Sequence, residues 1–238
     1  MKASVIIPVF NERESLPLVV ADIPRGLVAE IVVVDNGSTD GTDRIANGLP
    51  VRLVREARRG YGSACLAGLA ALEASPPDVV VFLDGDYSDH PEEMPALLAA
   101  IAAGADLVIG SRTLGQSEPG ALLPQARFGN LLACFLIRVL YGHRYTDMGP
   151  FRAIRWDACR RLKMRDTNFG WTCEMQVKAL REGLRVAEVP VSYRRRVGVS
   201  KITGTVSGTL RAGYKILWTI ARYGFSGRKT ENVKRETG

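Results

Sequence analysis

Two carboxylates one residue apart, Asp84 and Asp86, follow an apolar run, Val79–Leu83, with Gly85 between them. Because glycine tolerates a sharp bend, both can turn toward one crevice at the end of the strand that this run predicts. Hard oxygen ligands in this number suit Mg²⁺ or Mn²⁺, with diphosphate oxygens completing the shell. Such a metal would neutralise the charge that develops on a departing nucleotide diphosphate. The alternative is a solvated turn, which the apolar strand before the pair and Ser88-Asp89-His90-Pro91 after it disfavour.

Another carboxylate, Asp35, ends a second apolar run, Glu30–Asp35, and a polar, glycine-containing stretch up to Gly41 follows it. A carboxylate at the edge of a buried strand can accept a hydrogen bond from a ring N–H of a nucleobase. The alternative is a turn in which such a carboxylate caps the next helix. Both hold if Asp35 binds the base and Asp40 forms the cap.

Basic and glycine-rich segments supply candidates for phosphate binding. The loop Arg58-Arg59-Gly60-Tyr61-Gly62 enters a predicted helix and suits the approach of a phosphate or sugar hydroxyl, although an ordinary loop explains it equally well. Arginine binds phosphate through its planar fork, so Arg112, Arg127 and the Arg194–Arg196 run are candidates where they lie near the crevice.

The elements that must position these residues alternate between strands and helices in the first half of the chain. Expected strands are Ser4–Val9, Glu30–Asp35, Val51–Val54, Val79–Leu83, Asp106–Ile109 and Arg185–Tyr193. Expected helices are Glu14–Ile23, Ser63–Ala74, Pro91–Ala103, Arg127–Tyr141, Thr172–Glu182 and Thr205–Phe225. Alternation predicts a mostly parallel sheet covered by helices on both faces. Ligands of such sheets bind beyond the carboxyl ends of the strands, where Asn11, Glu12, Asp35 and the Asp84–Asp86 segment would converge.

Composition sets the class of protein. Of 238 residues, 46% are hydrophobic and 24% charged, which is a globular composition. Four cysteines without a CxxC pair and only two histidines argue against a disulfide framework and a zinc site, and favour the reducing cytoplasm. The N-terminus has no signal-peptide pattern, and no uncharged apolar run reaches the roughly 18 residues that a membrane span needs.

The net charge of +7 is concentrated at the C-terminus. From Arg185 onward, twelve Lys/Arg and three Asp/Glu give +9, and the rest of the chain, with twenty and twenty-two, gives −2. We expect a catalytic domain at 1–201, an amphipathic helical extension at 202–225 and a polar tail at 226–238. The extension would lie on an anionic membrane surface, at the inner face of the membrane. Alternatively, it would pack on the catalytic domain.

The ordered set of motifs resembles a known family. It comprises Val5–Glu12, Val33–Thr42, Asp84-Gly85-Asp86 and Gly110-Ser111-Arg112, followed by Arg127–Asn130, Thr146–Arg152, Glu188–Val191 and Arg195…Gly198-Val199-Ser200-Lys201. This set is similar to the family 2 glycosyltransferases of GT-A (Rossmann-like) fold, and within them to the polyprenyl- or dolichyl-phosphate mannosyl- and glucosyltransferases. The resemblance implies a metal-dependent, inverting transfer of a hexose from a UDP- or GDP-linked sugar to a polyprenyl phosphate, by a single displacement.

The resemblance also implies roles for individual residues. Those expected to hold the donor are Pro8, Asn11, Glu12, Asp35, Asp84, Arg195 and Lys201, with Asp84, Asp86 and Ser88 at the Mg²⁺ or Mn²⁺ ion. Those expected to receive the acceptor phosphate are Arg112, Arg127 and Asn130. Asp86, Arg112 and Asp147 would be catalytic.

Three departures from the family pattern leave alternatives open. Asn36 stands where a second carboxylate is usual, the C-terminal transmembrane helices of the branch are missing, and Phe169–Met175 matches loosely. A lipid phosphate is already ionised, whereas a hydroxyl acceptor would need a base, for which Asp147 or Glu174 are the candidates. The alternatives are therefore a soluble transferase acting on a small-molecule or glycan hydroxyl, and a sugar-phosphate nucleotidyltransferase without its usual glycine-rich signature. A nucleic-acid partner is not expected, because the C-terminal charge lacks a recognition motif.

Overall fold

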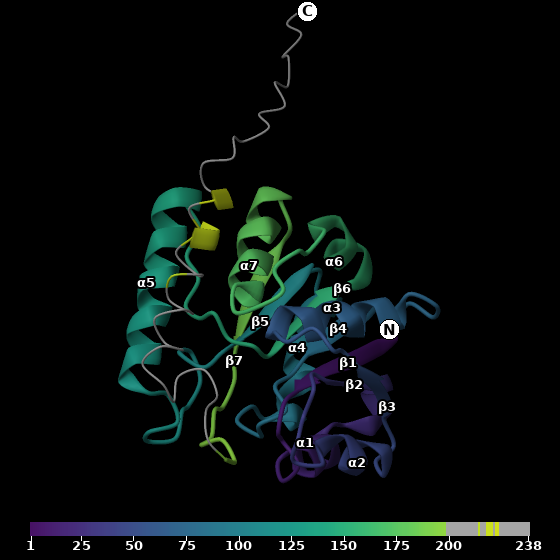
Figure 1. The fold of residues 1–238 in the computed structure, drawn as a ribbon. Coiled ribbons are helices and arrows are strands. Elements are labelled where there is room, and N and C mark those ends of the chain that lie inside the picture. The colour runs from purple at the N-terminus through teal and green to yellow at the C-terminus, as the bar shows by residue number, and fades with distance from the viewer. Residues whose placement is uncertain (199–213, 215–217, 221, 224–238) are drawn as a thin grey trace, which may run out of the picture.

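The structure, a computed structural model, describes residues 1–198, 214, 218–220 and 222–223. Its centre is a seven-stranded sheet in the order β3-β2-β1-β4-β6-β5-β7 (Figure 1). The strands are β1 (Ala3–Val9), β2 (Val28–Asp35), β3 (Arg52–Arg55), β4 (Val79–Phe82), β5 (Leu107–Ser111), β6 (Arg152–Arg155) and β7 (Val186–Pro190). All neighbouring strands run parallel except β6, which is antiparallel to both β4 and β5. The mostly parallel α/β sheet expected from the sequence is confirmed.

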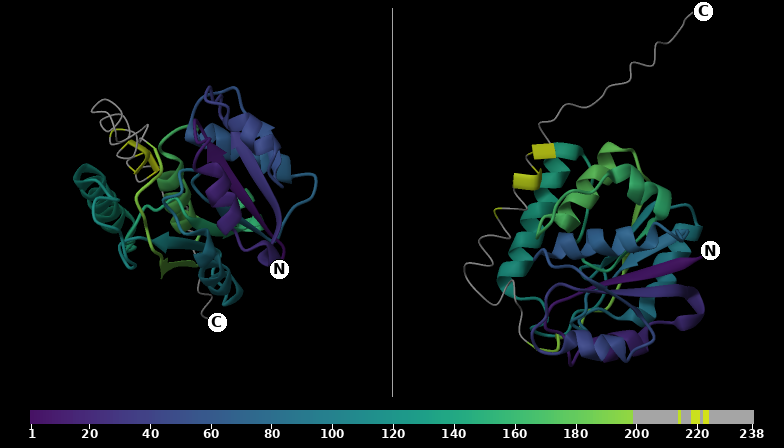
Figure 2. Two further views of the ribbon diagram at one scale, coloured as in Figure 1. Left: turned by 90° about the horizontal axis from the view of Figure 1, so that it is seen from below. Right: turned by 45° about the vertical axis from the view of Figure 1, so that its right-hand side comes forward.

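Helices cover both faces of this sheet, as Figure 2 shows. They are α1 (Leu16–Asp22), α2 (Thr42–Asn47), α3 (Tyr61–Leu72), α4 (Met94–Ala102), α5 (Pro124–Tyr141), α6 (Trp156–Leu162) and α7 (Trp171–Arg181). Successive strand residues point to opposite faces, so Ile6 and Val32 pack with α3, α5, α6 and α7, whereas Val5 and Val33 pack with α1, α2 and α4. The result is two apolar cores with the sheet between them.

Strand β6 and helix α6 were not expected from the sequence. The strand is short, and arginines at both of its ends interrupt any apolar pattern. Arg152 is nevertheless fully buried, because its guanidinium donates to main-chain oxygens of Gly149 and, at 3.0 Å, of Thr172. A charged side chain that is buried among polar partners interrupts the pattern of apolar residues that would indicate a buried strand. The sequence therefore did not predict β6.

The antiparallel direction of β6 decides what reaches the ligand-binding edge of the sheet. Phe82, the last residue of β4, pairs with Arg152, the first residue of β6. The segment that precedes β6 therefore lies at the same edge as the one that follows β4. In the same way Val9 pairs with Asp35, which puts the ends of β1 and β2 level with each other. Four loops meet at this edge.

Several sequence-based expectations fall partly or wholly outside the described residues. These are Lys201, most of the amphipathic segment 202–225 and the tail 226–238. No helix within the described part of the chain is both long and apolar enough to cross a membrane. The four cysteines are buried, and none of them forms a disulfide within the described part of the chain.

Candidate active site

The Asp84–Asp86 loop turns sharply just beyond β4. The residue in the left-handed conformation is Tyr87, with φ of 65°, rather than Gly85. A Cβ on Gly85 would lie 2.6 Å from Val9 Cγ1, so glycine is required there by space rather than by its freedom to bend. The loop is thereby pressed against the end of β1. Asp86 Oδ1 accepts hydrogen bonds from Ser88 N at 3.0 Å and Ser88 Oγ at 2.5 Å, which fix the carboxylate.

Negative charge is crowded in this loop. Burial and the charge of Asp86 raise the pKa of Asp84 to about 7. Burial and the charges of Asp84 and Asp86 raise the pKa of Asp89 well above its ordinary value. Asp84 Oδ1 is buried and has no hydrogen-bond partner among the residues that the structure describes. A divalent cation fits here, because it would give Asp84 Oδ1 a partner and offset the negative charge crowded in this loop. No group of three or more His, Cys, Asp or Glu side chains is placed to hold a metal in the described part of the chain, so donor oxygens must complete the shell.

A cavity of about 390 Å³ opens beside these carboxylates. Its lining residues include Pro8, Phe10, Glu12, Asn36, Arg59, Tyr61, Asp84, Asp86, Asn168, Phe169 and Arg196. The cavity wall thus combines the carboxyl ends of β1, β2 and β4 with two segments from the second half of the chain. A second hollow, of about 340 Å³, lies around Arg25 and Arg52, next to the opposite end of β2.

Of the residues expected to bind the nucleoside, Pro8 and Glu12 line this cavity and Asp35 does not. Asp35 Oδ1 accepts a hydrogen bond from Ser38 N at 3.2 Å, which is the turn-forming alternative weighed above. Asp40 supports the start of α2, since its Oδ1 accepts from Thr42 N at 2.9 Å. In this structure Asp35 therefore shapes the loop behind the cavity.

Asn11 and Glu12 hold the first loop in place. Asn11, with φ of 56°, accepts a hydrogen bond from Thr39 N through Oδ1 at 2.8 Å. Glu12 Oε2 accepts from Ser15 Oγ at 2.8 Å, which leaves Oε1 directed toward Arg196 at 3.3 Å. The loops after β1 and β2 are thus tied together beside the cavity.

Asn36, the departure from the family pattern, has a structural explanation. Its Nδ2 donates to the main-chain oxygens of Glu56 at 2.9 Å and Arg58 at 2.8 Å. Its Oδ1 accepts from Gly60 N at 2.7 Å. An amide satisfies all three contacts, whereas a carboxylate would face two carbonyl oxygens. Asn36 therefore fastens the end of β2 to the loop that enters α3.

The glycines of that loop allow a close main-chain contact. A Cβ on Gly60, whose φ is 140°, would lie 2.1 Å from Thr167 O, and one on Gly62 would lie 2.0 Å from Asp166 O. Ser63 N donates to Thr167 O at 3.0 Å. The glycines hence join the start of α3 to the segment carrying Asn168, as the ordinary-loop alternative expects, while Arg59, Gly60 and Tyr61 also line the cavity.

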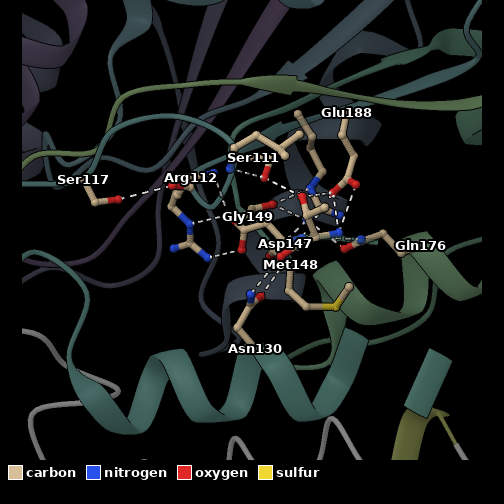
Figure 3. A network of polar contacts seen from close by, with 12 residues as sticks. Ser111, Arg112, Ser117, Asn130, Asp147, Met148, Gly149, Gln176 and Glu188 are labelled. Carbon is tan, nitrogen blue, oxygen red and sulfur yellow. Dashed lines mark hydrogen bonds and ion pairs between the residues drawn. The ribbon is translucent and has the colours of Figure 1, made fainter. Parts of the chain in front are cut away.

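A second polar group lies at the neighbouring strand end, around Arg112 and Asp147 (Figure 3). Arg112 Nε and Nη2 donate to the two oxygens of Asp147, each at 2.7 Å, and Arg112 N donates to Oδ2 at 2.8 Å. Burial alone would lower the pKa of Arg112, but the paired Asp147 outweighs that effect and raises it. Arg112 therefore keeps its charge.

Three further side chains hold the segment around Asp147. Asn130, on α5, donates to Thr146 O at 3.1 Å and accepts from Met148 N at 2.8 Å. Glu188 accepts from Thr146 N at 2.9 Å, and Gln176 donates to Asp147 O at 3.0 Å (Figure 3). Asn130 thus positions the loop that carries Asp147, using one of its two amide N–H groups and its side-chain oxygen.

Of the expected phosphate-binding arginines, two lie elsewhere. Arg127 is exposed on α5. Arg195 points away from the cavity, with N donating to Glu118 Oε2 at 2.8 Å and Nε to Pro119 O at 2.7 Å. The next residue, Arg196, enters the cavity and contacts Asp86 Oδ2 at 3.2 Å. The basic run Arg194–Arg196 was a candidate as a whole and the resemblance selected Arg195 within it, whereas the structure places Arg196 at the cavity.

Comparisons with known proteins cover most of the chain. The profile of one family, glycosyl transferase family 2, matches residues 4–163. An uncharacterized glycosyltransferase of Mycobacterium tuberculosis is 38% identical over 212 residues, covering 88% of this chain and 93% of that protein. The polyprenol monophosphomannose synthase of Mycolicibacterium smegmatis is 34% identical, covering 94% and 87%. The undecaprenyl-phosphate mannosyltransferase of Micrococcus luteus is 32% identical, covering 96% of each chain.

Solved structures show the same fold. Glucosyl-3-phosphoglycerate synthase of Mycobacterium tuberculosis, in complex with Mn²⁺, UDP and phosphoglyceric acid, superposes with a TM-score of 0.75 at 22% identity. The match covers 94% of this chain and 78% of that one. At this level of identity the likeness concerns the arrangement of the elements.

Proposed function

The chain belongs to glycosyl transferase family 2, and on that premise we propose that it transfers a hexose from a UDP- or GDP-linked sugar to a polyprenyl phosphate. The transfer is metal-dependent and inverts the anomeric carbon in a single displacement. The observation that carries the proposal is the pair Asp84 and Asp86 on the wall of a cavity of about 390 Å³ at the ends of β1 and β4.

Asp84 and Asp86 would hold Mg²⁺ or Mn²⁺ in that cavity. Bound there, the metal neutralises the charge that develops on the nucleotide diphosphate as it leaves. Ser88 acts through Asp86, since its two hydrogen bonds fix Oδ1 and leave Oδ2 for a further ligand. The structural neighbour was solved with UDP and Mn²⁺, which supports this chemistry for the fold.

The nucleoside would lie against the ends of β1 and β2. Pro8 and Glu12 line the cavity directly. Asn11 and Asp35 keep the proposed donor role through the loop that they shape, because each fixes a main-chain N–H of the 36–41 segment. Lys201 remains a proposed diphosphate ligand that lies outside the described residues.

The acceptor phosphate would approach the Arg112–Asp147 pair. Asp147 already accepts three N–H bonds from Arg112, which disfavours it as a base. Burial alone would raise the pKa of Glu174, but hydrogen bonds from Lys178 and from main-chain groups lower it, so this carboxylate is a weak base too. An acceptor that is already ionised needs no base, and this favours a phosphate over a hydroxyl.

The names of two relatives point to this acceptor class, one through its product, polyprenol monophosphomannose, and the other through undecaprenyl phosphate. The outer face of α5 is a separate observation that supports a lipid partner. Phe128, Leu131, Phe135 and Val139 follow each other at helical spacing and expose between 59% and 68% of their surface. We include the anionic surface of a membrane among the partners for this reason.

The experiment that tests the proposal combines donors with acceptors. The donors are UDP-glucose, UDP-mannose, GDP-glucose and GDP-mannose. Each is supplied with undecaprenyl phosphate or with a water-soluble hydroxyl acceptor, in the presence of Mn²⁺, Mg²⁺ or EDTA. We expect one donor to give a lipid-phosphate glycoside of inverted configuration, and no product in EDTA. Transfer to the hydroxyl acceptor with none to the lipid would establish the alternative acceptor class.

A further inference from the structure

The side chain of Arg196 occupies the donor cavity itself. Its Nη2 lies 3.2 Å from Asp86 Oδ2 and 3.3 Å from Glu12 Oε1, so one guanidinium bridges two carboxylates. Its Nε is buried without a hydrogen-bond partner among the described residues. Arg196 is thus the cation that faces Asp86 in the protein without a donor.

The oxygen that Arg196 contacts is the one a metal would need. Asp86 Oδ1 is already engaged by two hydrogen bonds from Ser88. Oδ2 is therefore the oxygen with room for a cation, and Arg196 is directed at it. A guanidinium and a divalent ion cannot share this position, because both are positively charged and each requires close approach to the same oxygen.

The backbone presents Arg196 to the site in a fixed way. Val197 N donates to Asp86 O at 3.0 Å, and Arg194 N donates to Ser88 O at 2.9 Å. These two bonds attach the 194–197 segment directly to the metal-binding loop. With the segment held in this way, Arg196 reaches the cavity, whereas the Arg195 guanidinium donates to Pro119 O outside it.

We propose that Arg196 couples metal binding to donor binding by competing with the metal for Asp86. Without a donor, its guanidinium neutralises Asp86 and holds the metal affinity low. A nucleotide diphosphate brings anionic oxygens into the cavity, and the guanidinium moves to them because arginine pairs well with phosphate. Asp86 Oδ2 is then released to the metal. This inference rests on the proposed donor site and assigns Arg196 a positioning role within it.

Metal binding without catalysis tests the proposal. The affinity for Mn²⁺ is measured by the electron paramagnetic resonance of free Mn²⁺, with and without UDP, for the wild type, Arg196→Gln and Arg195→Gln. Arg195→Gln removes the same charge one residue away and is the matched control. Without UDP, we expect Arg196→Gln to bind Mn²⁺ about tenfold more tightly than the wild type, a size usual for coupling between two ligand sites.

UDP supplies the second arm. We expect UDP to raise the Mn²⁺ affinity of the wild type and of Arg195→Gln strongly. The factor by which UDP raises the Mn²⁺ affinity of Arg196→Gln should be about tenfold smaller. Adding Asp86→Asn to Arg196→Gln should abolish the gain, because the coupling is a direct contact. Equal Mn²⁺ affinity in wild type and Arg196→Gln would overturn the inference. Failure of every variant to bind Mn²⁺, even with UDP, would instead overturn the proposed metal site and the inference with it.

Discussion

The two oxygens of Asp86 have different surroundings, and this decides what a conservative substitution does. Ser88 holds Oδ1, whereas Oδ2 forms an ion pair with the Arg196 guanidinium. Asp86→Asn keeps the size of the side chain and removes its charge. We expect transfer to fall by about a thousandfold, because several kcal/mol of leaving-group stabilisation depend on the metal.

The loss is measured as turnover at saturating donor and Mn²⁺, with the melting temperature as the control for folding. Asp84→Asn should be nearly as damaging, since it removes the other proposed metal oxygen. Turnover close to that of the wild type in a folded Asp86→Asn protein would refute the metal role of this residue.

Asn36 allows a test of why this chain lacks the usual second carboxylate. Asn36→Asp would place a carboxylate oxygen against the main-chain oxygens of Glu56 and Arg58, which now accept from its amide. We expect a loss of about 1–3 kcal/mol in the free energy of unfolding and a raised KM for the donor. Urea unfolding and donor titration measure the two effects. Tighter donor binding at unchanged stability would show that the position binds ligand instead.

For single residues, the sequence predicted which residue types would form the site better than it predicted their individual contacts. The strand-end carboxylates were identified because an apolar run before an acidic residue is a strong local pattern. Which arginine enters the cavity was not predictable, because Arg195 and Arg196 differ only in which side of an irregular segment they face. Asp35 was ambiguous for the same reason, since base binding and turn formation require the same residue type.

Among the elements, the strands with continuous apolar runs were predictable and β6 was not. Val79–Phe82 is fully buried and apolar, whereas β6 begins with an arginine that only a tertiary network can satisfy. The missing strand mattered for the site. It brings Asp147 to the same edge as Asp84, and a sheet assumed to be wholly parallel does not place the two segments together.

Helix α7 carries a buried charge whose contribution to stability depends on pH. Glu174 is 1% exposed and accepts from Asp166 N at 2.7 Å, from Tyr223 OH at 2.8 Å and from Lys178 Nζ at 2.7 Å. Its pKa is lowered in the folded protein. The stability it provides is therefore present above the ordinary carboxyl pKa and is lost as the pH falls through the lowered one.

We expect Glu174→Gln to reduce the free energy of unfolding by about 2 kcal/mol at neutral pH, or roughly 4–8 °C in melting temperature. The difference from the wild type should shrink as the pH falls from the ordinary carboxyl pKa through the lowered pKa of Glu174, where the wild-type carboxylate also becomes neutral. Calorimetry across this range measures both. A difference that stays constant with pH would mean that the side chain acts through packing alone.

For the whole molecule, the proposed donor cavity joins both halves of the chain. Asn168, Phe169 and Arg196 complete a wall that begins with the first strand ends. The family profile ends at residue 163, before these residues. The fold class and the donor edge could be predicted from alternating elements, but the closure of the cavity depends on contacts between segments about a hundred residues apart, such as Ser63 N with Thr167 O.

Helix α5 lies at the outer edge of the molecule beside α7, as Figure 1 shows. It contains no acidic residue and carries Arg127 and Arg138 at the border of its exposed apolar face. Such a face can lie in the interface of an anionic bilayer. We expect the protein to sediment with vesicles containing phosphatidylglycerol, less so at high salt because the arginines are screened.

The double substitution Phe128→Ser with Phe135→Ser should remove most of this binding. The matched control is Leu18→Ser with Leu114→Ser, which changes two exposed leucines away from α5. Equal vesicle binding by both double variants would show that α5 is not the contact. A change from dimer to monomer in the α5 variant, without any vesicle binding by the wild type, would identify a second copy of the chain as the occupant of this face.

The two faces of α5 have a kinetic consequence. Its inner face positions the Asp147 segment through Asn130, while its outer face carries the apolar stripe. An enzyme seated on a bilayer by this helix meets its lipid substrate by diffusion in two dimensions. Its rate then follows the mole fraction of acceptor in the lipid and not the bulk concentration, so adding inert phospholipid at constant acceptor slows turnover by surface dilution.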